Sequence, residues 1–406
     1  MARLMELSIS QLLAAIFVLG LLVCRPSSSF TITQHYSFIV TDAPIHLLAL
    51  SSSDDTLGPS PVEDAKTNKF GLQSLIDCIK NPSTSSAIQH PTEAAHLFHG
   101  RGGLFPGCEH LTLDWFPPVW LLKSYNQPLD EASLSIIQDT IQEQHDLLIK
   151  NESSEAVCTL VYQHRSQTNS STEIVSGHVP RPHIITEQGL QFYIQVERAR
   201  NHGIFLDMAA GRQWVRQYCA ARQNEPTTVL NLFAYICGFS VAALQDAGSS
   251  TTVVNIDMVQ GVLKTGQRNH ELNQCPSTTK FLSHNIFKSW GKLKKLGPYE
   301  LIIADPPTFQ KSSFVAAKDY GKVVRRIPQM LAHDSSSRAV LCLNAPELDT
   351  EWLKEVVQEE APELEFVRRL ENPPTFASRF PEKGLKVLIY KWSEEGLDWA
   401  INRDES

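Results

Sequence analysis

The sequence predicts an α/β protein in which a Rossmann-like sheet with helices on both faces follows a smaller β-rich domain. Three short apolar runs, within residues 228–240, 253–257 and 301–309, each end in a polar or glycine-rich turn. A parallel strand buried on both faces has this pattern and delivers a ligand-binding turn at its carboxyl end. Helix-like and strand-like segments also alternate regularly beyond Arg212, which is typical of βαβ winding.

The individual elements follow from the same periodicities. Helical spacing predicts helices over residues 131–148, 212–223, 239–247, 260–273, 314–332 and 350–360. Further strands are expected around residues 157–162 and 190–196, and a partly antiparallel pair at 364–370 and 385–390. We therefore divide the chain into a targeting segment (1–50), a linker (51–91), the small domain (92–198) and the large domain (199–395).

The strand ends carry side chains suited to bind a nucleoside. Asn231 is free to hydrogen-bond beside a turn in which Gly238 is the tight point. Asp257 closes the next strand and suits a pair of ribose hydroxyls, with Met258 beside it to pack on a base. Asn285 follows a third run and is placed to meet an adenine amino group.

A carboxylate on a rigid turn ends the strand at residues 301–304. Proline fixes its own backbone angle and restrains the residue before it, so Pro306 and Pro307 hold Asp305 in place. Such a turn can position a flat amine. We expect Asp305 to be functional, because a carboxylate between an apolar strand and two prolines serves no packing need.

These motifs resemble the class I S-adenosylmethionine-dependent methyltransferases that include the bacterial 23S ribosomal RNA large-subunit enzymes acting on cytosine C5 and on guanine. The resemblance covers roughly residues 97–390, and its matches are residues 203–208, Arg212, 230–235, 238–240, Asp257, Asn269, 272–273 and 305–309. It implies that S-adenosylmethionine is the cofactor and ribosomal RNA the partner. It places the donor against Phe205, Asp207, Asn231, Ala234, Tyr235, Gly238 and Asp257. Met258 and Asn285, chosen above from the strand ends, complete the expected donor site. Asp305, Pro306 and Phe309 would face the acceptor, although Asp207 could instead cap the helix that follows it.

One departure from the family pattern bears on the acceptor atom. The cytosine C5 branch carries a Ser-Cys-Ser motif whose thiolate activates the ring. Here Cys342 lies within an apolar run and Asn344 occupies the aligned position. Guanine-modifying members of the family carry asparagine in this region, so the resemblance implies direct transfer to a nitrogen, with guanine preferred, rather than carbon methylation. A protein or small-molecule acceptor, and a non-catalytic nucleotide-binding or assembly protein, are the alternatives.

In the small domain, Arg101 lies in a glycine-rich segment and is a natural phosphate or base contact for a substrate, unless the glycines form only a structural turn. The net charge of −8 does not itself support nucleic-acid binding. Positive charge does flank the 301–304 strand, although a solvated helix face explains it equally well. These residues are Lys288, Lys292, Lys294, Lys295, Lys311, Lys318, Lys322, Arg325 and Arg326.

The amino terminus resembles a bipartite presequence. The apolar run at residues 12–24 is short for a membrane span but suits a signal peptide, so we expect no stable span in the mature chain. An acid-free segment rich in Ser and Thr follows, as in transit peptides, and an organelle would supply ribosomal RNA. We expect delivery to a plastid, with secretion or a retained anchor as alternatives. The eight cysteines show no metal-binding spacing, so we expect no metal site. The sequence assigns no oligomeric state.

Overall fold

The computed structural model describes residues 71–81, 92–149, 157–166, 170–198, 200–310 and 313–404. The expected targeting segment and most of the expected linker lie outside these residues. Within the described ranges, none of the helices combines the length and the apolar character that a membrane crossing requires.

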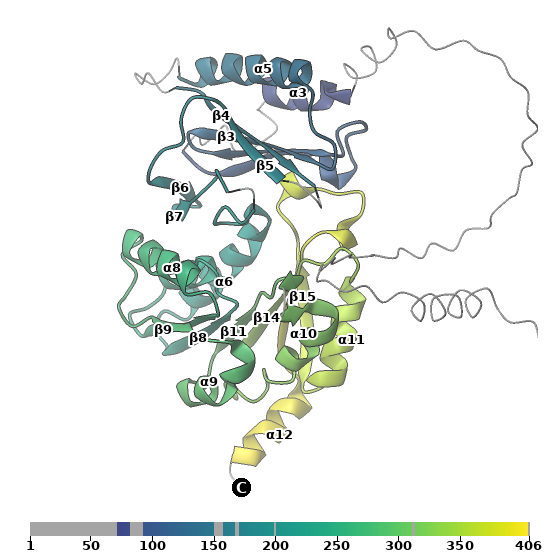
Figure 1. Cartoon of the computed structure of the whole chain (residues 1–406). Coiled ribbons are helices and arrows are strands. Elements are labelled where there is room, and N and C mark those ends of the chain that lie inside the picture. Colours follow the sequence, from purple (N-terminus) through teal and green to yellow (C-terminus); the bar gives the residue numbers. More distant parts are fainter. Residues whose placement is uncertain are drawn as a thin grey trace, which may run out of the picture. The chain divides into compact units, whose positions relative to one another are not determined.

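The large domain contains a seven-stranded sheet in the order β10-β9-β8-β11-β14-β16-β15 (Figure 1). Its strands from β10 to β14 are parallel, whereas β16 runs antiparallel to both β14 and β15. This confirms the Rossmann-like sheet and the antiparallel final pair. The strands are β8 (Thr227–Leu232), β9 (Thr251–Asp257), β10 (Lys280–Ser283), β11 (Leu301–Ala304), β14 (Arg338–Leu343), β15 (Leu364–Leu370) and β16 (Lys386–Trp392).

Helices cover both faces of this sheet. In β11, Ile302 and Ala304 belong to the core shared with α10 and α11, whereas Leu301 and Ile303 belong to the core shared with α6 and α7. Successive strand residues point to opposite faces, so apolar residues are needed at every position. The helices are α6 (Ala209–Ala221), α7 (Gly238–Gln245), α8 (Gln260–Leu272), α9 (Trp290–Leu296), α10 (Ala316–Val324), α11 (Thr350–Glu360) and α12 (Glu394–Asp404).

The expected helix over residues 314–332 is wrong in length. The short strand β13 (Phe314–Val315) precedes α10 and pairs with β12 (Phe309–Gln310). At the other end, Pro328 has no N–H to donate to the carbonyl of Val324, and the amide of Ile327 donates to it instead at 3.0 Å. The helix therefore spans only Ala316–Val324.

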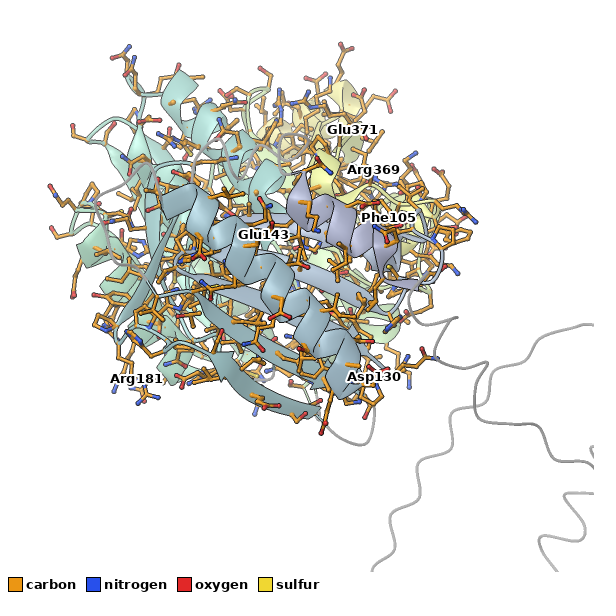
Figure 2. All side chains as sticks on the ribbon, turned by 90° about the horizontal axis from the view of Figure 1, so that it is seen from above. Phe105, Asp130, Glu143, Arg181, Arg369 and Glu371 are labelled. Carbon is orange, nitrogen blue, oxygen red and sulfur yellow. The ribbon has the colours of Figure 1, made fainter. Side chains whose placement is uncertain are left out.

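The small domain is a five-stranded sheet in the order β1-β2-β3-β4-β5, with only β3 and β4 parallel. The strands are β1 (Ala95–His99), β2 (Leu111–Phe116), β3 (Val119–Tyr125), β4 (Thr159–Arg165) and β5 (Ser170–Ser176). The expected helix is α5 (Glu131–Ile149), which lies with α3 over one face of the sheet (Figure 2). The hairpin of β6 (His183–Glu187) and β7 (Leu190–Ile194) follows.

The segment expected as a linker contributes to the small domain. Helix α3 (Gln73–Lys80) buries Leu75 and Ile79 in the same core as Leu113 and Ile141. Its amphipathic pattern explains this placement, because one apolar stripe can pack against the sheet while polar residues face water. Residues 71–81, which were expected to belong to the linker, are therefore part of the small domain.

Candidate methyl-donor and acceptor site

The predicted site residues come together because parallel strands place their carboxyl ends at one edge. Strand order reverses between β8 and β11, since β8 is followed by β9 on one side and lies against β11 on the other. A crevice forms at such a switch point in open α/β sheets. At this edge Asp257 ends β9, and Asp305 and Asn344 follow β11 and β14.

The loop after β8 has an unusual backbone. Phe233, Tyr235 and Cys237 have φ angles of 58°, 48° and 62°, in the left-handed region. Each costs a non-glycine residue about 1 kcal/mol or more, so the surrounding structure must hold the loop in this form. Gly238 has no such angle, and an added Cβ there would lie 3.4 Å from Cδ of Arg212. The left-handed backbone of this turn therefore falls at Phe233, Tyr235 and Cys237, and not at Gly238, which was expected to be its tight point.

Asp257 is held by two backbone donors. The amides of Tyr235 and Val259 donate to its two carboxylate oxygens at 3.0 and 2.9 Å. Burial raises the pKa of Asp257, and the backbone donors oppose this only in part. No cation of the described residues contributes to this balance. A carboxylate with unfilled acceptor positions and no cationic partner suits neutral hydroxyl donors such as those of ribose.

Two large apolar side chains of the expected donor site are exposed. Met258 is 44% exposed and Phe205 is 46% exposed, although both are large hydrophobic residues. The ring of Phe205 lies 5.7 Å from that of Tyr235, so the structure brings these two predicted residues together. Asn285 begins the turn after β10, where its side-chain oxygen accepts from the amide of Phe287 at 2.9 Å. Exposed apolar surface beside Asp257 can cover a flat adenine ring.

Asp207 and Asp305 interact through their charges. Asp207 lies in the 3₁₀ turn Leu206–Met208 and provides no side-chain cap to α6, which removes the capping alternative. Burial and the negative charge of Asp207 raise the pKa of Asp305 to about 7, and Arg212 opposes this only in part. Arg212 binds Glu187 with two hydrogen bonds of 2.7 and 2.6 Å and donates to the carbonyl of Phe205. It thereby fixes the segment that carries Asp207.

Asn231 was expected to be free to hydrogen-bond with a ligand, but its side chain is already paired in the core. Its side-chain nitrogen donates to Asn255 at 2.9 Å, and Asn255 in turn donates to Ser240 at 3.0 Å. Ser240 lies 2.7 Å from Nε2 of His270, and all four residues are buried. This polar chain links β8, β9, α7 and α8, so the contribution of Asn231 is to the core.

The acceptor side of the site is formed by the loop after β11. Pro306 is buried, and the ring of Phe309 is 66% exposed. The hydroxyl of Thr308 donates to the backbone carbonyl of Asn344, which joins this loop to the end of β14. Asn344 is exposed, whereas Cys342 is fully buried and burial raises the pKa of its thiol well above its usual value. No thiolate is therefore presented here.

A cleft of about 1160 Å³ lies between the two domains. Of the predicted site residues, Arg101, Phe205, Asp207 and Asn344 line it. The sequence interpretation missed its small-domain wall, because those side chains come from separate strands and only β-alternation could have indicated their shared face. They are His96, His99, Asp114, Lys123, Tyr125 and Arg165, and His202 lines the cleft beside them from the segment that follows the small domain.

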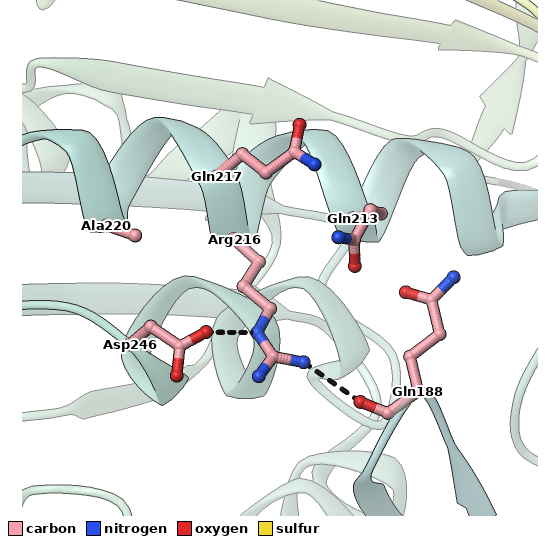
Figure 3. A pocket seen from close by; sticks show the side chains of 6 residues that line it. All are labelled: Gln188, Gln213, Arg216, Gln217, Ala220 and Asp246. Carbon is pink, nitrogen blue, oxygen red and sulfur yellow. Dashed lines mark hydrogen bonds and ion pairs between the residues drawn. The ribbon is translucent and has the colours of Figure 1, made fainter.

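A second hollow of about 580 Å³ lies outside helix α6 (Figure 3). Its centre is filled by Arg216, which binds Asp246 at 2.5 Å and the carbonyl of Gln188 at 2.9 Å. It contains none of the predicted site residues. Of the basic residues expected near the acceptor, Lys322 pairs with Asp319 and Arg325 with Glu360. Lys311 lies outside the described residues, and across those ranges no cluster of His, Cys, Asp and Glu could hold a metal ion.

Comparison with known proteins establishes the class. A family model described as S-adenosylmethionine-dependent methyltransferase matches residues 95–391. The chain belongs to this family, whose description gives S-adenosylmethionine as the methyl donor. The residues present fit that group, because Asp257 offers hydroxyl acceptors beside the exposed side chain of Met258.

Individual relatives refine this picture. Ribosomal RNA large subunit methyltransferase I of Aeromonas salmonicida is 33% identical over 144 residues, which cover 35% of each chain. The protein of that name from Yersinia pestis is 33% identical over 149 residues, or 36% of each chain. The match thus spans about a third of the length of these relatives.

Solved structures share the fold. A methyltransferase complexed with SAH has a TM-score of 0.63 and 22% identity, with 82% of this chain and 83% of that chain covered. An S-adenosylmethionine-dependent methyltransferase from Streptococcus mutans has a TM-score of 0.63 and 21% identity, with 79% and 81% covered. At these identities the likeness concerns the fold alone.

Proposed function

We propose that the enzyme methylates a nitrogen of a base in ribosomal RNA, with guanine favoured, by direct transfer from S-adenosylmethionine. The observation that carries this proposal is the contrast at the end of β14. Cys342 is fully buried, whereas Asn344 is exposed and lines the cleft. Carbon methylation of cytosine needs a thiolate that adds to the ring, and nitrogen methylation needs only position and electrostatics. The names of the relatives support RNA as the acceptor.

The chain's own groups suit such a transfer. S-adenosylmethionine supplies an electrophilic methyl group, and a nitrogen lone pair of the base forms the new bond as the carbon–sulfur bond breaks. The carboxylate of Asp305 accepts a hydrogen bond from the acceptor N–H, whose proton is then lost to this carboxylate or to water. A pKa of about 7 allows Asp305 to take a proton near neutral pH. The base must leave its stack to reach Asp305, as in other base-modifying enzymes.

The test combines the full chain with radiolabelled S-adenosylmethionine and undermodified ribosomal RNA, followed by digestion to nucleosides. We expect label in one guanine nucleoside, and loss of more than about a hundredfold in rate in Asp305→Ala. Asp398→Ala, an exposed carboxylate of α12, is the matched control. Donor binding without label in any RNA would contradict the proposal and favour a protein or small-molecule acceptor, or a non-catalytic role.

A second arm tests the acceptor atom. RNA containing 5-fluorocytidine traps enzymes that attack the ring through a thiolate, because the covalent adduct cannot be resolved. We expect no such adduct, and we expect Cys342→Ala to retain its rate of transfer. An adduct that is lost in Cys342→Ala would overturn the nitrogen assignment while leaving RNA as the acceptor.

A further inference from the structure

The small domain presents a polar face to the cleft. Strand register aligns Thr112 with Lys123 and Lys123 with Gln163, and places Tyr125 beside Arg165. Among their neighbours in sequence, Leu113, Leu122 and Tyr162 point to the opposite face, where they belong to the core under α3 and α5. The polar residues that face the cleft are therefore distinct from the residues that form the core of the small domain.

Two arginines of this face converge on one aromatic ring. The guanidinium carbon of Arg101 lies 4.3 Å from the ring centre of Tyr125, and that of Arg165 lies 5.9 Å from it. A terminal nitrogen of Arg165 also lies 2.7 Å from Nε2 of His202. Nε of Arg165 and Nδ1 of His202 are buried without a hydrogen-bond partner. The ring holds both guanidinium groups in place, and donors remain unused.

The carboxylate on this wall is already neutralised. Asp114 is buried, lies 2.5 Å from Nδ1 of His96 and accepts from Lys123. Within the described ranges, neither Arg101 nor Arg165 forms an ion pair with a carboxylate.

The histidines respond to the excess positive charge. Burial, with Lys123 and Arg165, lowers the pKa of His202 to about 3. Burial also lowers the pKa of His99 to about 4, to which His96 and Arg101 contribute. A partly buried group of cations without counter-charge is suited to bind an anion.

We propose that Arg101 and Arg165, held by Tyr125, bind a backbone phosphate of the RNA strand whose base reaches Asp305. This inference rests on the proposed function and adds a binding position for the acceptor. A guanidinium group matches the phosphate oxygens with parallel hydrogen bonds. Phosphate contacts of this kind set the register of a nucleic acid without reading its sequence.

The distribution of charge in the small domain supports the cleft side as the side that binds RNA. Helix α5, on the opposite face of the sheet, contains no Lys or Arg. Figure 2 looks down on this outer face and shows Asp130 and Glu143 there. The exposed acids of α5 are Glu131, Asp139, Glu143 and Asp146. The net charge of −8 therefore conceals a division between an acidic outer face and a basic cleft.

The experiment measures binding of a fluorescein-labelled single-stranded RNA to the full chain over a range of KCl concentrations. Each phosphate contact contributes about 0.7 to the slope of log Kd against log salt for a single strand. We expect Arg101→Gln and Arg165→Gln each to weaken binding and to lower this slope by about 0.7. Arg165→Lys should keep most of the slope, because it keeps the charge.

Arg181→Gln is the matched control, since Arg181 is exposed, pairs with Glu197 and lies outside the cleft. It should leave the slope unchanged. Thermal unfolding and the Kd for S-adenosylmethionine should match wild type in Arg101→Gln, and the KM for RNA should rise with kcat preserved.

The outcomes separate this inference from the proposed function. Methylation of RNA by wild type, with an unchanged salt slope in both cleft variants, would overturn the phosphate site alone. Absence of RNA binding and methylation by wild type, with S-adenosylmethionine bound, would overturn both. If Arg181→Gln lowered the salt slope as much as the cleft variants do, the site would also be overturned. The slope would then depend on the total charge of the protein and not on a contact in the cleft.

Discussion

Asp207 and Asp305 come from segments almost a hundred residues apart in sequence, and the charge of Asp207 acts on the partly buried carboxyl of Asp305. Burial and this charge raise the pKa of Asp305 to about 7, whereas Arg212 opposes the shift. Two neighbouring carboxylates in one site ionise less readily than either would alone. The pair therefore couples the donor-side segment 203–208 to the acceptor-side turn.

We expect the rate of methyl transfer to rise with pH between about pH 5 and pH 8, with a midpoint near 7. The ionised form of Asp305 is the one that accepts from the acceptor N–H. Asp207→Asn removes a like charge and should move the midpoint to lower pH. Single-turnover rates over this range test the prediction, with Asp246→Asn as a control; a midpoint unmoved in Asp207→Asn would contradict it.

The same shift predicts an effect on stability. The pKa of Asp305 in the folded state, about 7, lies above its ordinary value of 3.8, so folding favours the protonated form. Its stabilising contribution is complete below about pH 4 and is lost as the pH rises through about 7.

We therefore expect Asp305→Asn, which stays neutral, to be more stable than wild type at about pH 8, by on the order of 2 kcal/mol, with a smaller difference at about pH 4. Urea unfolding without S-adenosylmethionine at the two pH values measures this. Equal stability of variant and wild type at the higher pH would show that folding does not raise the pKa of Asp305.

Substitution of Asp257 should weaken binding of the methyl donor. Asp257→Ala removes the acceptor for ribose and also leaves the backbone amides of Tyr235 and Val259 without their partners. We expect the Kd for S-adenosylmethionine to rise about tenfold to a hundredfold, since hydrogen bonds to a charged group contribute about 1.5–3 kcal/mol. Isothermal titration calorimetry tests this. An unchanged Kd in Asp257→Ala would remove the residue from the donor site.

Helix α3 should be needed for the stability of the small domain. Leu75 is fully buried in the core between the helices and the sheet, whereas Gln73 on the same helix is exposed. We expect Leu75→Ala to lower the free energy of unfolding by about 2–5 kcal/mol, and Gln73→Ala to change it by about 0.5 kcal/mol or less. Chemical denaturation followed by circular dichroism measures both. Equal effects of the two substitutions would place α3 outside the folded core.

Much of the large domain was predictable because its signals are local. Apolar runs predicted β8, β9 and β11, and the helix expected at residues 350–360 matches α11. That helix begins where Asp349 accepts from the amide of Trp352 at 2.8 Å, a cap formed within four residues. The turns that follow parallel strands also placed Asp257 and Asp305 at one edge.

The sequence by itself thus determined the strand ends, the family and the methyl donor. Only the tertiary structure decided that Asn231 binds Asn255 in the core, that the left-handed backbone falls at Phe233, Tyr235 and Cys237, and that α3 belongs to the small domain. It also brought Arg101 and Arg165 to the same ring of Tyr125. The physical reason is that strand alternation and helix capping act between near neighbours, whereas these features depend on contacts between residues distant in the chain.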